Sequence, residues 1–483
     1  MNFRTILNIL SKVLLYVSCF MALPVVVSLF YDRSDTLHLA ASCLITCAVG
    51  TLLHLLTRRY RKADISHRDA FIVVTLAWVL MSSFASVPYL LTGTFTSFTD
   101  AYFESMSGFT TTGASVLTDV EVVPRGVMFW RCLTQWIGGM GIIVLALAVL
   151  PMIGSGGMQL FKAEVPEISV DKLRPRIIDT AKALWIIYVG ITGLNIVTLL
   201  IGGMDLYDAA CHAFTTMATG GFSTKNASIA HYRSPFLEYA CTFFMFVAGG
   251  NFSLYFHVIR GNVGRLWRNE EFRFYVTTTL TATFLIALNL WGSAVYDSFT
   301  DSFRHSIFQV VTIMTTTGYF SADFEKWTPF GQVALVLVMF LGGMIGSTGG
   351  GIKQVRVLLM LKQGYREMYQ LIHPRAVTSV KLDEKFLTKD ILGSIWGFVF
   401  LFIAVTIVAT AGMTALGVDL VTSATTVISA ICNVGPALGE AGPTENYAAL
   451  PASGKWILTF CMLTGRLEVY TVLILFLPQF WKK

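Results

Sequence analysis

Four short segments rich in Thr, Gly and other small residues interrupt the long apolar runs of this chain. They are Thr110–Gly113, Ala218–Gly221, Thr315–Gly318 and Asn433–Pro436, and their glycines 113, 220, 318 and 435 lie 107, 98 and 117 residues apart. This regular return predicts four tandem copies of one unit. A polar loop at membrane depth is tolerated only where protein buries it or where it lines a water-filled path. Four such loops can therefore surround one pore.

The composition places these loops in a membrane. Hydrophobic residues make up 54% of the 483 residues and charged residues only 13%, whereas a soluble domain carries about 25% charged residues. Apolar stretches recur that match the length of about 20 residues needed to cross a bilayer as a helix. The first, from Val13 to Phe30, lacks a following small-residue cleavage site and is interpreted as a retained helix rather than a secretion signal. The eight cysteines show no CxxC spacing and are expected to be inert packing residues.

The predicted fold is an all-α polytopic membrane protein with four tandem helix–re-entrant loop–helix repeats around one pore. Residues 1–66 form two N-terminal transmembrane helices, near 10–30 and 37–57, and the pore repeats occupy 67–152, 180–262, 272–362 and 388–483. In the first repeat we expect an outer helix at 70–91, a re-entrant segment at 100–113 and an inner helix at 127–150. The inner helices also carry small residues in step, which would allow close helix approach: Gly138–Gly139, Gly249–Gly250, Gly342–Gly343 and Gly465.

Positive charge sets the orientation. The linkers 58–68, 162–182, 260–273 and 353–389 hold 5, 5, 4 and 8 of the 35 Lys and Arg residues. By the positive-inside rule these linkers are cytoplasmic, so the Thr/Gly loops open from the external side. Acidic residues near that mouth would either favour cations or be ordinary solvated charges: Asp100, Glu104, Asp119, Glu121, Asp301, Glu440 and Glu445.

The loop composition suits a dehydrated cation. Rings of backbone carbonyls can replace a hydration shell without adding net charge. Glycine helps to aim successive carbonyls inward because it reaches backbone conformations that strain other residues. The negative end of each short re-entrant helix would point toward the same ion.

The chain resembles the Trk/Ktr/HKT superfamily of potassium transporters, and especially its bacterial TrkH-type pore-forming subunits, over essentially its full length. The segments that carry the resemblance are Ser107–Ser115, Met217–Thr224, Met314–Tyr319, Leu341–Lys353 and Gly465–Tyr470. The resemblance implies a potassium filter with one Gly per repeat, carried over to Gly113, Gly220, Gly318 and Gly435, and a homodimer with one pore per subunit. The implied potassium-binding residues are Thr111, Thr112, Gly113, Thr219, Gly220, Gly221, Thr317, Gly318, Tyr319, Asn433, Val434 and Gly435. The fourth loop departs from the family pattern, since Asn433 and Val434 stand where Thr is expected.

Two features indicate gating. Six glycines fall within Gly342–Gly351, and each interior Gly costs a helix about 1 kcal/mol relative to Ala, so no regular helix is expected there. The resemblance implies a movable intramembrane loop below the filter, with gate residues Gly346, Ser347, Thr348, Gly349 and Gly350. A packing kink without a gating role is the alternative.

Arg466 lies within the last apolar span, where a guanidinium is costly and usually faces water or a partner. In the family the matching Arg projects into the pore as an electrostatic barrier; a structural pairing is the alternative. Glu468, two residues on, is a poor partner on a helix. Arg131, at the start of the first inner helix, is expected at the membrane interface.

The segment 353–389 is basic, which favours anionic lipid by default. The resemblance implies a second use, the docking of a cytoplasmic Rossmann-type nucleotide-binding regulatory subunit, TrkA-like. This chain carries no nucleotide fingerprint, so a nucleotide response would come from that partner. Besides the lipid bilayer, no nucleic acid partner is expected.

The leading functional hypothesis is potassium uptake across the bacterial inner membrane, driven by the gradient or coupled to another ion as symport. Permeation of sodium or of monovalent cations without selectivity is the nearest alternative. A membrane-embedded enzyme would need His212 and His305 to converge with Asp208 or Asp301, although these residues form no metal-ligand motif. A non-conducting scaffold subunit would be indifferent to changes at Gly113 or Gly318.

Overall fold

The computed structural model describes residues 2–31, 33–60, 66–149, 173–376, 378–383 and 385–482. Within these ranges the chain is almost entirely helical, and the predicted fold class is confirmed. Residues 61–65 and 162–172 of two predicted basic linkers, and the predicted end of the first repeat at 152, lie outside the described residues.

Two long helices, α1 (Phe3–Phe30) and α2 (Thr36–Thr57), form a hairpin at one edge of the molecule and are followed by η1 (Arg58–Tyr60). Each later unit begins with an outer helix: α3 (His67–Ala85) continued by α4 (Val87–Leu91), α8 (Leu173–Ile201), α13 (Glu270–Gly292) and α17 (Lys389–Ala415). Among the described residues these six spans are long and apolar enough to cross a bilayer, and two bent helix pairs add to them. The protein is therefore a multi-pass membrane protein.

Four short helices follow the outer helices and end at the Thr/Gly segments. They are α5 (Phe98–Phe109), α9 (Leu206–Met217), α14 (Phe299–Met314) and α18 (Leu420–Cys432). Each begins with a residue whose side chain accepts a hydrogen bond from a backbone N–H of the first turn: Ser97, Asp205, Ser298 and Asp419. Such caps satisfy N–H groups that a helix start leaves without partners. The cap fixes the outer end of each re-entrant helix.

The inner helices are short or broken in three of the four repeats. The first is α6 (Arg125–Val149), and the second is α10 (Pro235–Ala248) with α11 (Phe252–Ile259), bent by 99°. The third, α15 (Pro329–Leu341), stops before the predicted glycine-rich stretch, and the chain becomes helical again only at α16 (Gln354–Ile372). The fourth is α19 (Ala452–Arg466) with α20 (Glu468–Leu473) and η7 (Ile474–Phe476), bent by 111°. The predicted interruption of the third inner helix is confirmed.

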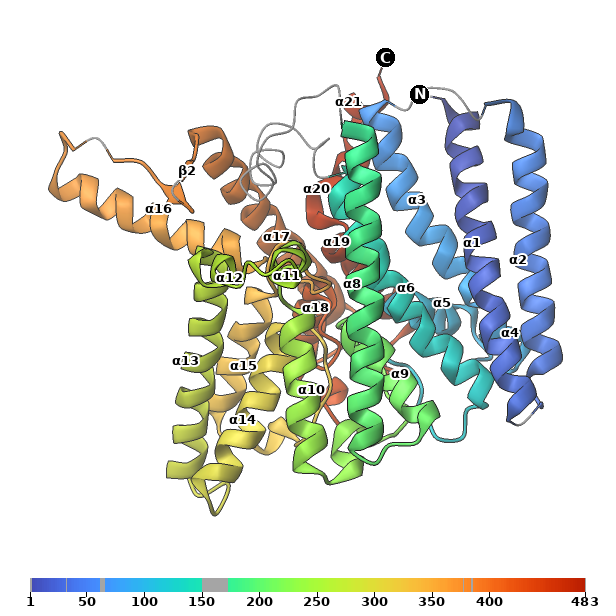
Figure 1. Ribbon diagram of the computed structural model, residues 1–483, viewed down its shortest axis with the longest axis horizontal. Coiled ribbons are helices and arrows are strands. Elements are labelled where there is room, and N and C mark those ends of the chain that lie inside the picture. Colours follow the sequence, from blue (N-terminus) through green and yellow to red (C-terminus); the bar gives the residue numbers. More distant parts are fainter. Residues whose placement is uncertain are drawn as a thin grey trace.

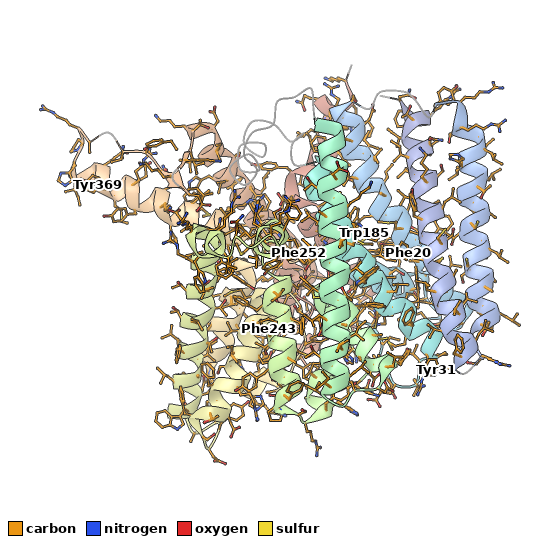
Figure 2. The ribbon with its side chains drawn as sticks, viewed as in Figure 1. Phe20, Tyr31, Trp185, Phe243, Phe252 and Tyr369 are labelled. Carbon is orange, nitrogen blue, oxygen red and sulfur yellow. The ribbon has the colours of Figure 1, made fainter. Side chains whose placement is uncertain are left out.

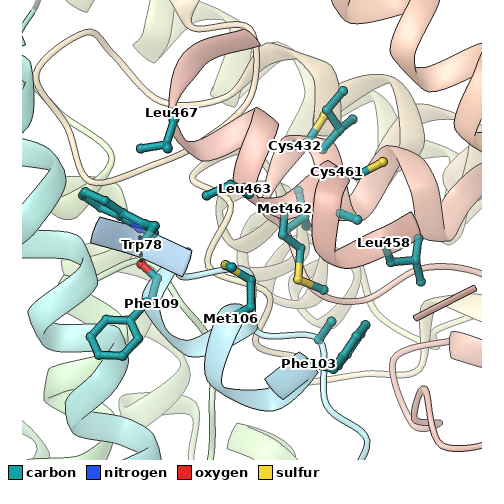
Figure 3. Close-up of a cluster of buried hydrophobic side chains, with 14 of the residues drawn as sticks. Trp78, Phe103, Met106, Phe109, Cys432, Leu458, Cys461, Met462, Leu463 and Leu467 are labelled. Carbon is teal, nitrogen blue, oxygen red and sulfur yellow. Dashed lines mark hydrogen bonds between the residues drawn. The ribbon is translucent and has the colours of Figure 1, made fainter. Parts of the chain in front are cut away.

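Each inner helix packs against the re-entrant helix of the next repeat, and the fourth closes on the first. The contacting pairs are α6 with α9, α10 with α14, α15 with α18, and α19 with α5. Figure 3 shows the closing contact, where Met106 and Phe103 of α5 face Met462 and Leu458 of α19. The four repeats therefore surround one axis although the chain is linear.

The predicted small residues permit this packing. A Cβ on Gly138 would lie closer than 3.0 Å to the carbonyl oxygen of Phe109, and a Cβ on Gly465 equally close to that of Ile431. The inner helices thus touch the backbone at the ends of the re-entrant helices. A larger residue at either position would push the inner helix away from the axis.

Helix α16 projects sideways from the bundle, away from α1 and α2 (Figure 1). The antiparallel strands β1 (Lys381–Leu382) and β2 (Lys385–Phe386) follow it and lead into α17. Leu382 and Val380 pack against Val355 and Leu359 at the base of α16, whereas Tyr369 lies near its far end, beyond the bundle (Figure 2). The base of this projection is anchored by apolar packing.

The remaining elements of the described residues are short: η4 (Ser228–Tyr232), α12 (Gly264–Arg268), η5 (Phe324–Lys326), η6 (Gly439–Ala441) and α21 (Pro478–Trp481).

Candidate functional site

The four re-entrant helices end in the same hydrogen-bonded turn. In the first, the N–H of Thr111 donates to the carbonyl of Gly108 (3.0 Å) and the N–H of Thr112 to that of Ser107 (2.9 Å). The same pair of bonds forms at Thr219 and Gly220, at Thr316 and Thr317, and at Asn433 and Val434. This is the Schellman pattern, which satisfies the last carbonyls of a helix. Each loop leaves its helix with the same geometry.

The turn requires a left-handed backbone at one residue. That residue is Thr111 (φ 52°), Thr219 (φ 54°), Thr316 (φ 60°) or Asn433 (φ 57°). Gly or Asn normally occupies this position, and a β-branched residue with positive φ is an outlier. Such strain costs on the order of 1–3 kcal/mol and collects at functional sites. Asn433, which departs from the Thr pattern of the sequence, tolerates this conformation better than the three Thr residues.

Two residues beyond each strained position stands a glycine with positive φ. These glycines are Gly113 (83°), Gly221 (76°), Gly318 (84°) and Gly435 (101°). The sequence pattern paired Gly220 with Gly113, Gly318 and Gly435. In the structure Gly220 lacks the positive φ and occupies the position of Thr112. The equivalent glycine is therefore the next residue, Gly221. The error arose because both residues are glycine.

The four glycines lie in a closed ring. A Cβ added to any of them would come closer than 3.0 Å to a carbonyl oxygen of the next repeat: Gly113 to Gly220, Gly221 to Thr317, Gly318 to Val434, and Gly435 to Thr112. The contacts therefore run from repeat 1 to 2, 3, 4 and back to 1. Only glycine allows this approach, because both its φ and the absence of Cβ are needed. We name these residues and the carbonyls they touch the carbonyl ring.

The structure brings eleven of the twelve predicted binding residues together in these loops. The side chain of the twelfth, Tyr319, contacts α9. Its hydroxyl donates to the carbonyl of His212 (3.0 Å) and forms a hydrogen bond with the hydroxyl of Thr215. Thr110 and Thr112 share a hydroxyl hydrogen bond (2.8 Å), as do Thr315 and Thr317 (2.8 Å). A ring of closely spaced carbonyls can replace the hydration shell of a cation.

A cavity of about 140 Å³ lies on the side of the carbonyl ring that the positive-inside rule predicts to be external, and all four ring glycines line it. Of the acidic residues predicted at the mouth, Glu445 lines this cavity, together with Arg131 and Lys225. Asp100 pairs with Lys455 (2.7 Å) and Asp301 with Arg304 (3.1 Å). The acidic residues therefore act mainly as partners for other groups.

Asp119 joins the loops that follow the first two turns. Its carboxylate accepts hydrogen bonds from the side chain of Asn226 (2.8 Å) and the N–H of Glu121 (2.9 Å). These bonds hold the pKa of Asp119 below its usual value. The carboxylate therefore remains charged on this surface.

The prediction that Arg131 lies at the membrane interface is wrong. Its side chain is 3% exposed, and its Nε lies 2.6 Å from the Oε1 of Glu104, which is fully buried. Glu104 also accepts hydrogen bonds from the hydroxyl of Ser115 (2.9 Å) and the N–H of Val116 (2.9 Å). Buried charges require such partners. The pair holds the chain where it leaves the first turn.

Arg131 reaches the second repeat as well. Its guanidinium donates to the carbonyl of Ser223 (3.3 Å) and lies 3.5 Å from the centre of the Phe222 ring. Sequence analysis treated Glu104 and Arg131 separately, and their 27-residue separation gave no signal of pairing. An Arg in an apolar span and a Glu within a re-entrant helix were the available hints.

The glycine-rich loop 342–353 lies directly below the carbonyl ring. The N–H of Gly350 donates to the hydroxyl of Thr316 (2.8 Å), and a Cβ on Gly350 would come closer than 3.0 Å to the carbonyl oxygen of Cys432. The hydroxyl of Thr348 donates to the carbonyls of Met217 (3.0 Å) and Ala248 (3.2 Å). The loop thus contacts the second, third and fourth turns or their helices.

Neighbouring residues secure the rest of this loop. The hydroxyl of Ser347 donates to the carbonyl of Met344 (2.7 Å), and the ammonium of Lys353 donates to that of Gly349. A Cβ on Gly346 would approach the amide of Asn251, with its Oδ1 2.9 Å away. The predicted gate residues 346–350 therefore form one compact segment.

Arg466 ends α19 and points at this loop. It is 3% exposed and donates to the carbonyls of Thr348 (2.6 Å) and Gly138 (3.2 Å). Its Nε has no hydrogen-bond partner among the described residues. Glu468 pairs instead with Arg356. Arg466 therefore carries a positive charge into the region below the ring, where it binds carbonyls of the loop and of α6.

The two histidines weighed for catalysis have separate structural contacts. His212 bonds the carbonyl of Asp208 (2.8 Å) and the hydroxyl of Ser223 (2.9 Å), whereas His305 lies near Ser321 (3.3 Å). No group of three or more His, Cys, Asp or Glu side chains suited to a metal occurs in the described part of the chain.

Comparisons with known proteins agree with the overall fold. A family model described as TrkH, a cation transport protein, matches residues 38–483. The Trk system potassium uptake protein TrkH of Salmonella typhimurium is 40% identical, with 100% of both chains covered. The Trk system potassium uptake protein TrkG of Escherichia coli is 36% identical over 95% of this chain and 94% of its own. The crystal structure of the potassium transporter TrkH from Vibrio parahaemolyticus matches with a TM-score of 0.92 at 36% identity, covering all of both chains.

Proposed function

Because the chain belongs to the TrkH family of cation transport proteins, we propose that it takes up potassium across the bacterial inner membrane through the carbonyl ring. The observation that carries the proposal is the closed order of contacts in which each ring glycine meets a carbonyl of the next repeat. Potassium is the transported ion and not a resident cofactor. The relatives at 36–40% identity are named for potassium uptake.

The ring is proposed to select the ion. Potassium would shed water in the external cavity and exchange it for the carbonyls of Thr112, Gly220, Thr317 and Val434. The strained turns hold these carbonyls without movement at the moment of binding, which reduces the cost of reorganisation. Val434 contributes a carbonyl as Thr does, so its apolar side chain is compatible with this role.

The loop 342–353 and Arg466 are proposed to form the gate. In the present conformation the loop contacts three of the four turns from below, and Arg466 donates to its Thr348 carbonyl. A cation leaving the ring would meet both this backbone and a positive charge. Conduction would then require the loop and Arg466 to separate.

Regulation and assembly extend the same proposal. The basic segment 353–389 and the projecting α16 would offer a cytoplasmic surface to a TrkA-like nucleotide-binding subunit. We further propose that two copies associate as a homodimer with one pore each. Uptake would be driven by the membrane potential or by symport with another cation.

Rubidium-86 uptake into proteoliposomes containing the purified chain tests the transport proposal. We expect excess potassium to compete with rubidium and excess sodium to compete weakly. Equal competition by sodium would favour the alternative of a pore without selectivity. The complete absence of uptake, with and without the regulatory subunit, would refute conduction.

Replacement of Arg466 by Ala tests the gate. The change removes the charge and the hydrogen bonds to Thr348 and Gly138, so basal uptake is expected to rise. The matched control is Arg273→Ala, which removes an exposed cytoplasmic charge at the start of α13. If Arg466→Ala and the control both leave basal uptake unchanged, Arg466 is not a barrier.

A further inference from the structure

The second repeat differs from the other three at one position of the carbonyl ring. Thr112, Thr317 and Val434 are all β-branched, whereas the equivalent residue is Gly220. Gly220 is followed by Gly221, so this part of the ring has two adjacent glycines. Glycine pairs have more backbone freedom than any other sequence. An additional support is needed if the Gly220 carbonyl is to hold its orientation.

The other turns have braces of their own. Hydroxyl pairs connect Thr110 with Thr112 and Thr315 with Thr317. In the fourth turn the amide of Asn433 donates to the hydroxyl of Thr112 (3.0 Å) and the carbonyl of Met462 (2.9 Å). No equivalent hydroxyl pair is available to the second turn, because Ala218 and Gly220 occupy those positions.

The side chain of Gln135, from α6 of the first repeat, occupies the space that a side chain at Gly220 would fill. A Cβ added to Gly220 would lie closer than 3.0 Å to three atoms, and all three belong to the Gln135 carboxamide. Its Nε2 donates to the Gly220 carbonyl (2.6 Å), and its Oε1 accepts from the N–H of Phe222 (3.1 Å). Gln135 is fully buried.

The support comes from one helix face. Arg131 lies four residues before Gln135 on α6 and donates to the carbonyl of Ser223 (3.3 Å). Ser223 directly follows Phe222, which Gln135 contacts. Gln135 lies three residues before Gly138, and the residues at the same distance before Gly249, Gly342 and Gly465 are apolar: Phe246, Met339 and Met462. The repeat that has no side chain at the ring position is therefore the one whose ring carbonyl accepts a hydrogen bond from the carboxamide of a neighbouring repeat.

We propose that Gln135 is a positioning residue for ion selection, which replaces the missing side chain of Gly220 and sets the orientation of that carbonyl in the ring. The inference rests on the proposed potassium uptake and identifies a determinant of its specificity. A carbonyl that turns freely can adapt to a smaller cation, whereas a held carbonyl preserves one ring size. Loss of Gln135 should therefore admit sodium more than it slows potassium.

Two substitutions separate the contacts of Gln135. Gln135→Glu preserves shape and the acceptor for the Phe222 N–H, but it places an oxygen against the Gly220 carbonyl. Gln135→Leu removes both hydrogen bonds. The readout is the ratio of the sodium and potassium concentrations that halve rubidium uptake. We expect this ratio to fall about tenfold in both variants, the change that corresponds to one ordinary hydrogen bond.

The matched control is Gln332→Leu. Gln332 also lies on an inner helix and donates to backbone carbonyls, those of Glu325 (2.6 Å) and Trp327 (3.3 Å), but in an external turn. This control should leave the ratio unchanged. A general loss of folding would lower uptake of all ions in proportion, so the ratio distinguishes positioning from stability.

A double substitution tests the shared space directly. Gly220→Ala in the otherwise unchanged chain should sharply reduce uptake, since the new Cβ meets the carboxamide. In a Gln135→Ala background the same substitution should cost far less. Equal effects in the two backgrounds would overturn the proposal, because sites that share no space are additive.

Failure of this inference differs from failure of the transport proposal. If the unchanged protein shows no potassium preference, the proposed function is wrong. If it selects potassium and both Gln135 variants keep the same ratio, the role of Gln135 is wrong.

Discussion

The four turns of the carbonyl ring and the loop 342–353 are both irregular backbone inside the membrane, but they are held in opposite ways. The turns are closed by hydrogen bonds within a few residues, such as Thr112 to Ser107. The loop also has local bonds, such as that from Ser347 to Met344, but its contacts with the rest of the molecule come from distant groups: Met344 donates to Gly249, and Arg466 donates to Thr348, 118 residues away. Local bonds make a rigid element, whereas long-range bonds break when the elements that supply them move.

This difference matches the two tasks proposed for these regions. An element that selects an ion should be preorganised, since its carbonyls must not collapse around a smaller cation. A gate needs a second arrangement within a few kcal/mol. The turn occurs four times around the ring, whereas among the described residues the glycine-rich loop occurs in the third inner helix alone. In the proposed function, the four repeated turns select the ion and the single glycine-rich loop controls its passage.

The strongest way to break the ring is Gly113→Ala. The new Cβ would overlap the Gly220 carbonyl oxygen and would also face a positive φ. We expect rubidium uptake to fall at least about 100-fold, since the overlap costs several kcal/mol. Gly417→Ala is the control, because its φ is 89° but nothing lies within 4 Å of its Cβ position. Comparable loss in both variants would attribute the effect to φ strain alone.

The next largest effect is expected at the buried pair beside the ring. Arg131→Gln leaves the Glu104 carboxylate buried without its cation, which typically costs about 3–5 kcal/mol. The thermal unfolding temperature in detergent should fall and uptake should fall with it. Replacing both residues, as in Arg131→Met with Glu104→Met, should recover much of the stability but not the transport. If the double variant transports normally, the pair serves folding alone.

A smaller effect on uptake is expected for a substitution in the loop 342–353. Thr348→Ala removes hydroxyl hydrogen bonds to Met217 and Ala248. The loss of about 1 kcal/mol from the closed arrangement should raise basal uptake about fivefold. The ratio of sodium to potassium competition should stay unchanged, because the ring is untouched. A shift in that ratio would mean that the loop and the ring are not separate elements.

Much of the architecture was predictable because its signals are local in the chain. Hydropathy revealed the spans, and the six glycines of 342–351 correctly excluded a helix. Two further repeated signals were available and unused: the caps Ser97, Asp205, Ser298 and Asp419, and the prolines at the starts of the inner helices, such as Pro235 and Pro329. Both mark helix starts for reasons of backbone chemistry.

The errors have a different origin. Gly220 and Gly221 are indistinguishable by composition, and only their φ values identify which one belongs with Gly113. Arg131 near a helix start suggested an interface, because the sequence does not reveal that Glu104 is buried beside it. In both cases the missing information was a neighbour in space.

By itself the sequence determined the membrane-spanning class, the four repeats, the positions of the loops and the interruption below them, since hydropathy and backbone preference act over short stretches of chain. The tertiary structure decided the cyclic order of the ring, the register of the second turn, and the contacts of Gln135 with Gly220 and of Arg466 with Gly138. These contacts join residues 85 and 328 positions apart. Packing around the axis brings such partners together, because each repeat contacts the next one.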